Sequence, residues 1–356
     1  MEKPSFPPLL KQKLLNLLNR VNGVFDKIKK YPYQKRIKSL KKQKINRIFL
    51  RYYRKITSSW RLFCSCFAGF LFIYYILGGL IVDDTSVTFV YPQAKEKNQK
   101  SEMVNAMAFL INREIDHKMW TPNLPFIFPA YILDNTPNFQ IGVISSVRDI
   151  AGLLKNFSGP NAAQKKNLKK AYEYLQYSPY IWLLSQTGSF SIAPSANAQY
   201  RKARNELLQY NKEGVFPISA LEFEKYLAKI NQSLQVLCSR NDNQITEHSD
   251  DWFDFSADDV FYRAKGFAFG YWQIAEAVGV DYKAVILQYN VYTEWTHLLA
   301  SLRKTAEFQP LIVRNANPES SFAPNHLAVQ NYYLKRAQAA ALQILAKIRR
   351  ENARQN

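Results

Sequence analysis

The sequence contains little cysteine and little glycine, and each shortage excludes a class of protein. Three cysteines among 356 residues cannot form the framework of a disulfide-stabilised scaffold. The 12 glycines include no cluster with the spacing of a phosphate-binding loop, so we expect no nucleotide site of that kind. Serine and cysteine also lie in no recognisable nucleophile motif. Because 47% of the residues are hydrophobic and 21% are charged, the chain does not belong to the disordered class.

Charge is absent from residues 62–82, which read LFCSCFAGFLFIYYILGGLIV. A helix of this length, at 1.5 Å per residue, spans roughly the 30 Å of a membrane's hydrocarbon core. Trp60 and Arg61 precede it, as suits a membrane interface, and Asp83 and Asp84 follow it. The segment starts too late and is too long for a cleaved signal peptide. We therefore predict one uncleaved transmembrane helix over residues 62–82.

Positive charge is concentrated before this segment. Residues 1–61 contain 18 lysines and arginines and two acidic residues, whereas the remaining residues contain 30 and 26. No lysine or arginine follows the segment until Lys95. The positive-inside rule then places the N-terminus in the cytoplasm and the later residues outside, in the periplasm of a bacterium. The predicted location is the bacterial inner membrane, with a periplasmic C-terminal domain.

Residues 1–61 form the predicted basic cytoplasmic head. Apolar side chains recur there at three- and four-residue steps, which predicts an amphipathic helix; they are Leu10, Leu14, Leu18, Val21, Phe25 and Ile28. Basic and apolar residues are then interleaved from Tyr33 to Lys55, which suits contact with anionic lipids of the inner membrane. Because a topology signal explains the same charges, we do not expect nucleic acid as a partner. A cytoplasmic partner on the leucine stripe remains open.

The chain after the transmembrane segment has a helical pattern. Residues 83–100 form a predicted linker, in which Ser86–Tyr91 could form one short strand. Capping residues such as Ser219 and Asn325 precede several apolar-periodic runs, and Asp281 is a further candidate cap. We predict helices at about residues 101–119, 136–157, 162–177, 196–212, 219–237, 256–279, 281–303 and 326–350, and a short apolar helix that starts at Pro179. The predicted fold class is all-α: one N-terminal transmembrane helix, then a multi-helix, bundle-like extracytoplasmic domain at residues 101–356.

One apolar stretch of this domain resists a helical interpretation. Residues 120–138 read WTPNLPFIFPAYILDNTPN and contain four prolines. We interpret the stretch as an ordered strap across the bundle, with the wall of a binding groove as the alternative. The candidate interface residues are Trp120, Asn123, Asp134, Asn135, Asn138 and Gln140. A second loop, residues 240–259, holds seven acidic residues but lacks the spacing of an EF-hand, so we interpret it as a solvated loop.

Several segments resemble an uncharacterised bacterial family, the domain of unknown function 2333. The most specific is LDNTPNFQ, residues 133–140, within the longer stretch Leu110–Gly142. The other segments are Asn112–Asp116, Trp120–Asn123, Tyr200–Asn211 and the FYRAKG run Phe261–Gly266. The resemblance implies a bacterial inner-membrane protein with no assigned activity, and it implies no catalytic residues.

Two Glu-x-x-His motifs offer the sharpest chemical alternative. Glu114 with His117, and Glu294 with His297, could each share a helix face, and two such helices can hold a di-iron carboxylate site. Glu114 could also act as the general acid of a wall-active hydrolase, since a buried carboxyl near Trp120 would have a raised pKa. The motifs equally suit charged helix surfaces. We favour that interpretation and expect no cofactor.

The favoured function is therefore not enzymatic. We predict a single-pass inner-membrane protein whose helical periplasmic domain binds or scaffolds another envelope component. The expected partners are anionic lipids at the basic head and an envelope protein at the strap. The alternative is a periplasmic envelope enzyme of the hydrolase or di-iron type.

Overall fold

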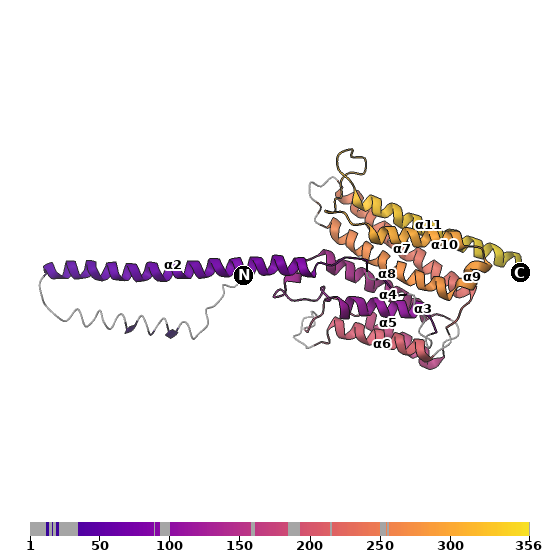
Figure 1. Ribbon diagram of the computed structural model, residues 1–356, viewed down its shortest axis with the longest axis horizontal. Helices are drawn as coiled ribbons and strands as arrows, with labels where there is room; N and C mark the ends of the chain where they lie inside the picture. Colours follow the sequence, from indigo (N-terminus) through magenta and orange to yellow (C-terminus); the bar gives the residue numbers. More distant parts are fainter. Residues whose placement is uncertain are drawn as a thin grey trace. The chain divides into compact units, whose positions relative to one another are not determined.

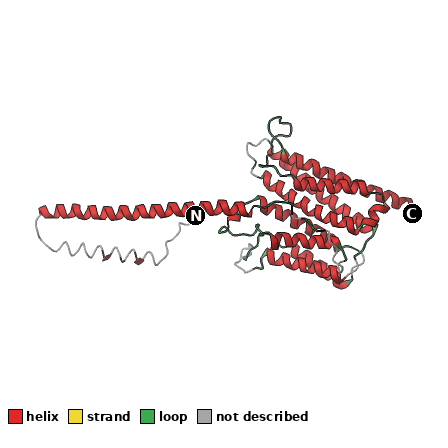
Figure 2. Cartoon of the chain, in the orientation of Figure 1, coloured by secondary structure: helices red, strands yellow, loops and turns green. Residues whose placement is uncertain are grey.

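The computed structural model describes residues 12, 13, 16, 19, 20, 35–88, 90–92, 100–157, 161–183, 193–213, 216–249, 254 and 256–355. Every regular element in this part of the chain is a helix, which confirms the all-α prediction (Figure 2). The chain divides into two compact units, Met1–Leu71 and Phe72–Asn356. Within the amphipathic helix predicted for the basic head, residues 12, 13, 16, 19 and 20 are described and are helical, whereas the residues of its apolar stripe lie outside the described part of the chain.

The long helix α2 runs from Lys35 to Val82. Its portion Ser59–Val82 has a mean hydropathy of 2.1, is long enough to cross a membrane, and has almost no buried side chains. Apolar side chains without a protein cover favour an apolar solvent, at about 25 cal/mol for each Å² removed from water. The helix predicted over residues 62–82 is thus present as the candidate membrane-spanning segment.

The strand expected at Ser86–Tyr91 is wrong. Residues 83–88 and 90–92 have no regular structure, since the described chain offers no second strand with which to pair. Side chains of the domain instead satisfy part of this backbone. Tyr91 N–H donates to Gln273 Oε1 at 2.7 Å, and Arg113 Nη2 donates to the Ser86 carbonyl at 2.5 Å. The segment is therefore held by the helical domain as an irregular stretch.

The helical domain is built around two helices, α4 and α8, which pack along each other (Figure 1). Helices α3, α5 and α6 cover one side of this pair, while α7, α10 and α11 cover the other. The bounds are α3 Glu102–Asn112, α4 Asn135–Leu154, α5 Ala162–Leu175, α6 Ala196–Glu213, α7 Ala220–His248, α8 Ala257–Asp281, α9 Lys283–Gln288, α10 Tyr292–Glu307 and α11 His326–Gln355. Two short elements lie between α3 and α4: the π-helix η1 (Arg113–His117) and the 3₁₀-helix η2 (Pro129–Ile132).

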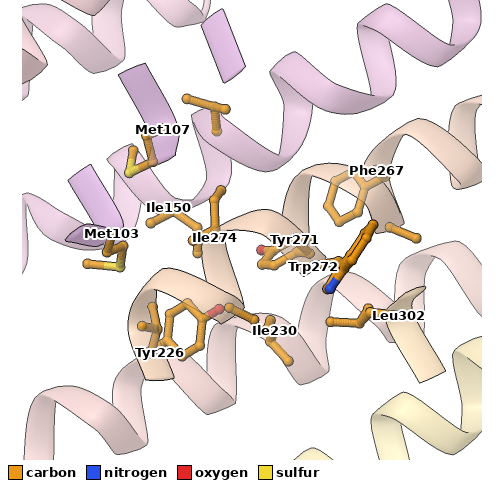
Figure 3. Close-up of a cluster of buried hydrophobic side chains, with 14 of the residues drawn as sticks. Met103, Met107, Ile150, Tyr226, Ile230, Phe267, Tyr271, Trp272, Ile274 and Leu302 are labelled. Atoms are coloured by element: carbon orange, nitrogen blue, oxygen red, sulfur yellow. The ribbon is translucent and has the colours of Figure 1, made fainter. Parts of the chain in front are cut away.

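The aromatic-rich helix α8 forms the centre of the core. A helix that is apolar on all sides has to be buried on all sides, and most residues of α8 are buried. Figure 3 shows four of its side chains among residues from α3, α4, α7 and α10; the labelled residues are Met103, Met107, Ile150, Tyr226, Ile230, Phe267, Tyr271, Trp272, Ile274 and Leu302. The core thus draws on helices from both sides of the α4–α8 pair.

Glycines allow α4 and α8 to approach closely. A Cβ atom at Gly266 would lie 1.9 Å from the carbonyl oxygen of Phe139, and one at Gly142 would lie 2.3 Å from that of Arg263. Real Cβ contacts essentially never fall under 3.0 Å. At the present spacing of the two helices, these positions therefore accept only glycine.

The helix starts were predicted in part, and the short helix expected from Pro179 is wrong over residues 179–183, which form turns and bends. Ser219 and Asn325 cap α7 and α11 as expected. Asp281, by contrast, does not cap the helix that follows it. Its carboxylate accepts hydrogen bonds from the N–H groups of Glu102 and Met103, at 2.9 and 3.0 Å, and so completes the cap of α3, whose N-cap residue is Ser101. Asp281 thereby joins the end of the central helix to the start of the bundle.

Helix α7 is longer than predicted, because it continues past Leu237 to His248. Packing on α11 supports this extension: the buried Asn241 donates from Nδ2 to Gln330 Oε1 at 3.0 Å. The first half of the expected acidic loop is therefore helical.

Candidate functional site

A polar cluster fastens the residues after the candidate span to the domain. Thr136 Oγ1 donates to Asp83 Oδ1 at 2.6 Å and accepts from Asp84 N–H at 3.1 Å. Lys118 Nζ lies 2.9 Å from Asp84 Oδ2. Burial lowers the pKa of Lys118. Partial burial would raise the pKa of Asp84, but hydrogen bonds from Ser86 and Lys118 hold that pKa below its usual value. The carboxylate therefore remains charged opposite the lysine at neutral pH.

Behind this cluster, Arg113 and Glu114 form a fully buried ion pair. Both residues belong to η1, and π-helical turns often mark functional positions. The Arg113 guanidinium also lies 4.5 Å from the centroid of the Phe269 ring. Among the described residues, Glu114 Oε2 has no hydrogen-bond partner, so the arginine supplies most of the stabilisation of this buried carboxylate.

Four of the six predicted interface residues lie inside the domain. Trp120, Asn123, Asn138 and Gln140 are buried. Trp120 donates to the Pro179 carbonyl at 3.1 Å, and Asn123 donates to the Ile181 carbonyl at 3.0 Å. Asn138 donates to the Asp259 carboxylate. The Gln140 amide oxygen accepts from the N–H and the hydroxyl of Thr121, at 2.9 and 2.8 Å. These side chains hold the strap in place. The exposed side chains of the strap include the apolar and aromatic ones of Phe126, Ile127 and Tyr131.

The two remaining candidates lie at the start of α4. Asp134 is exposed and accepts a hydrogen bond from the N–H of Asn135 at 2.8 Å, as the N-cap of that helix. Asn135 is half-buried. The Asp134 carboxylate and the Asn135 N–H thus serve the helix start, and any role of these residues in binding a partner stays a prediction.

The four candidate metal ligands are not brought together. Glu114 is paired with Arg113, and Glu294 Oε1 lies 2.6 Å from Lys347 Nζ. His117 and His297 are exposed. Among the described residues, the cluster of potential metal ligands is a different set, Asp134, Asp258 and Asp259, each with a carboxylate oxygen within 4.8 Å of the others. An exposed acidic cluster of this kind is common without a metal.

This cluster predicts a pH-dependent stability. Burial, followed by the charge of Asp134, raises the pKa of Asp258. A raised pKa in the folded state means that the ionised carboxylate destabilises the fold at neutral pH. This destabilisation disappears as the pH falls through that pKa and the group is protonated. We expect Asp258→Asn to raise the Tm at pH 7 by roughly 1–2 °C, because solvent limits a partly exposed charge to about 1 kcal/mol at most. Thermal scans between pH 7 and pH 4 should show the gain disappearing.

Asp254 is the matched control, because its pKa is shifted in the opposite direction. Burial would raise its pKa, but hydrogen bonds from Gln244, Asn315 and Ser256 lower it overall. Asp254→Asn should therefore lower the Tm at pH 7, and this loss should shrink in acid. Equal shifts for the two variants at every pH would contradict the assignment.

A groove runs along α4 and α7, bordered by α8 over most of its length and by Tyr172 of α5 at its far end. Three cavities of about 330, 240 and 340 Å³ follow one another along it. The first two share Leu237, Arg240 and Arg263, and the second and third share Asp149 and Lys229. The lining residues of α4 extend from position 138 to position 153, about 22 Å along the helix axis. The groove is therefore elongated.

The helix packing explains why this groove exists. The glycine contacts draw α4 towards α8, whereas α4 and α7 meet much less extensively. Hydrogen bonds connect the wall of the groove to the core. The buried Tyr271 hydroxyl donates to Ser233 Oγ at 3.2 Å, and Ser233 Oγ donates to Asp149 Oδ2 at 2.7 Å. The wall of the groove is therefore set by side chains that the core holds rigidly.

Three arginines give the groove its positive charge. Arg148, Arg240 and Arg263 line it, and none of them forms an ion pair within the described residues. Arg263 donates to the amide oxygen of Asn138, at 2.8 and 3.2 Å, which leaves guanidinium donors free. Two acidic residues also line the groove: Asp149 is paired with Lys229 Nζ at 3.4 Å, and Asp259 lies near Arg263, whose charge acts on it. The arrangement can accept an anionic group between the arginines.

The sequence did not lead us to predict this groove. A signal was present, because Lys229, Gln232, Ser233 and Arg240 recur at helical spacing on one face of α7. A polar stripe on one helix is, however, usually a solvated face. The sequence does not show that this stripe faces the polar stripe of α4, because that depends on how the glycines seat α4 on α8.

Comparison with known proteins gives a family. The family model described as an uncharacterized protein conserved in bacteria, domain of unknown function 2333 (DUF2333), matches residues 123–248 and 220–350. The matched range covers more than half of the chain and includes the strap from Asn123 onwards and the three arginines of the groove. No curated protein and no solved structure matches the chain.

Proposed function

The chain belongs to the family of domain of unknown function 2333, and we propose that it is a membrane-anchored module that binds an anionic component of the cell envelope in the groove along α4. In this proposal the N-terminal head is cytoplasmic and rests on anionic lipids of the inner membrane. The helical domain lies in the periplasm. The distribution of basic residues around the candidate span supports this orientation.

The observation that carries the proposal is the set of three arginines, Arg148, Arg240 and Arg263, on one elongated groove. Arginine binds carboxylate and phosphate through paired hydrogen bonds, and it does so best where no internal carboxylate occupies it. A groove about 22 Å long suits an extended chain with more than one anionic group. Apolar side chains that line the same cavities, among them Leu237 and Phe267, favour a ligand that also has an uncharged backbone.

The geometry gives less support to the enzymatic alternative. A general acid has to reach its substrate, but the Glu114 side chain has no exposed surface and is paired with Arg113. The di-iron alternative lacks a cluster formed by its four candidate ligands among the described residues. We therefore propose binding, without a catalytic step.

Binding of soluble anions tests the proposal. We expect the detergent-solubilised full chain to bind linear tripolyphosphate more tightly than inorganic phosphate, since the longer anion can contact more than one arginine. Arg148→Gln and Arg263→Gln should each raise the Kd by roughly 10- to 150-fold, because a hydrogen bond to a charged group contributes about 1.5–3 kcal/mol. Isothermal titration calorimetry at two salt concentrations measures both effects, and a tetraglutamate probe compares carboxylate with phosphate.

Arg336→Gln is the matched control. Arg336 lies on α11, outside the groove, and its side chain contacts Tyr332. The variant removes the same charge from the domain, so a merely long-range electrostatic effect would weaken binding equally. Equal Kd values for all three variants would show that the groove is not the site.

A further inference from the structure

We propose that Phe126–Tyr131, the exposed middle of the uncharged stretch of residues 119–133, enters the membrane leaflet on the domain side and contacts lipid at the boundary between headgroups and acyl chains. The stretch reads MWTPNLPFIFPAYIL, and no charged residue occurs in it between Lys118 and Asp134. The inference rests on α2 crossing the membrane. It is independent of the groove and of any ligand bound there.

Hydrogen bonds join this stretch to the candidate span itself. The Tyr74 hydroxyl donates to the Ile127 carbonyl at 3.1 Å, and the Tyr75 hydroxyl donates to the Phe126 carbonyl. Both tyrosines lie within Ser59–Val82. The strap is thus bonded to residues that the membrane surrounds.

A close contact between Gly78 of α2 and Pro129 of the strap fixes the position of the strap along α2. A Cβ atom at Gly78 would lie 2.3 Å from Cγ of Pro129, so the proline ring rests directly on the glycine. The contacts fall four to eight residues before Val82, which is about 6–12 Å along the helix. Interfacial segments bury their apolar side about 5–10 Å into the boundary of headgroups and acyl chains. The strap is therefore placed at the depth of that boundary.

The side chains that the strap exposes suit this environment. Phe126, Ile127 and Tyr131 have exposed fractions of 68%, 53% and 59%. On the adjoining turns of α2, Leu77 and Ile81 are also exposed, at 55% and 82%. An exposed apolar surface that continues onto a transmembrane helix favours lipid as its partner. Tyrosine is enriched at this depth, because its ring is apolar and its hydroxyl reaches polar groups.

The backbone of the strap also suits a weakly hydrated environment. Lipid offers no hydrogen bonds to backbone groups, so these must be satisfied internally. The N–H groups of Phe128, Tyr131 and Leu133 donate within the strap at 3.0–3.1 Å. The tyrosine hydroxyls of α2 serve two further carbonyls, and the three prolines between positions 120 and 130 have no N–H to satisfy.

Depth-dependent quenching tests the proposal on the full chain. All three native cysteines are replaced by alanine, and single cysteines are then placed at Phe126, Tyr131 or Leu342 and labelled with an environment-sensitive fluorophore. Leu342 is the control, because it is exposed on α11 with a fraction of 47%. The proteins are reconstituted in phosphatidylethanolamine–phosphatidylglycerol vesicles that carry a nitroxide either near the headgroup or near the acyl-chain end.

We expect the labels at 126 and 131 to be quenched several-fold more strongly than the label at 342, with the shallow nitroxide more effective than the deep one. Aqueous iodide should show the reverse order of positions. If the labels at 126 and 131 are as accessible to iodide as the label at 342, the proposal is overturned. A label at Leu77 shows that α2 itself is in the membrane, and the anion titrations report separately on the groove.

Discussion

Replacing Gly266 with alanine should cost about 3 kcal/mol or more and lower the Tm by roughly 10 °C. The added Cβ atom would lie 1.9 Å from the carbonyl oxygen and 2.7 Å from the carbonyl carbon of Phe139. Both are backbone atoms, so no side-chain rotation can relieve the clash. The helices α4 and α8 would have to separate, and the core between them would lose contacts. Thermal unfolding of the solubilised full chain measures the loss.

Two other glycines provide the comparison. A Cβ atom at Gly69 would have no heavy atom within 4 Å, so Gly69→Ala should leave the Tm unchanged or raise it slightly through better helix propensity. At Gly279 the nearest atom is Nε1 of the Trp295 side chain at 2.8 Å, so Gly279→Ala should have an intermediate effect. A Gly266→Ala variant as stable as Gly69→Ala would contradict the close packing of α4 on α8.

Removing either partner of the buried pair Arg113–Glu114 should destabilise the domain by about 3–5 kcal/mol. The reason is that the remaining charge would stay buried after losing the opposite charge that now stabilises it. Glu114→Leu leaves the guanidinium with the Ser86 carbonyl and the Phe269 ring, and Arg113→Met leaves a carboxylate that already has one unsatisfied oxygen. The double variant should recover a large part of the loss, since two apolar side chains then occupy the site.

A double-mutant cycle from denaturant unfolding measures this coupling. The exposed pair Arg303–Glu307 is the control, because its side chains have exposed fractions of 58% and 36%, and Glu307→Gln should cost under about 1 kcal/mol. If the two losses at Arg113 and Glu114 simply add, the residues do not stabilise each other. The structural account of η1 would then be wrong.

Local signals in the sequence predicted much of the fold. The uncharged run of residues 62–82 predicted the candidate span, and the side chains of Ser219 and Asn325 predicted the starts of α7 and α11. These features depend only on neighbouring residues. The cap supplied by Asp281 could not be predicted, because its partners at Glu102 and Met103 lie about 180 positions away along the chain.

The strap also shows that local sequence signals do not predict contacts between distant residues at the candidate site. Its prolines and lack of charge predicted an ordered, non-helical segment. Its polar residues were expected to face a partner, but Trp120, Asn123 and Gln140 are buried and hydrogen-bonded within the domain. The apolar residues Phe126 and Tyr131 are the exposed ones. Whether a side chain of such a segment points inward depends on which carbonyls and amides lie across from it, and the sequence does not contain that information.

The most direct test of the central claim is photo-crosslinking in native membranes. A benzophenone amino acid replaces Val236, which lines the groove and has an exposed fraction of 48%, and the control position is Leu342, with 47%. We predict that position 236 captures an adduct that carries phosphate or carboxylate groups, that Arg148→Gln and Arg263→Gln reduce its yield, and that position 342 does not capture it. An adduct formed equally at both positions, or one whose yield ignores the arginine substitutions, would contradict the account.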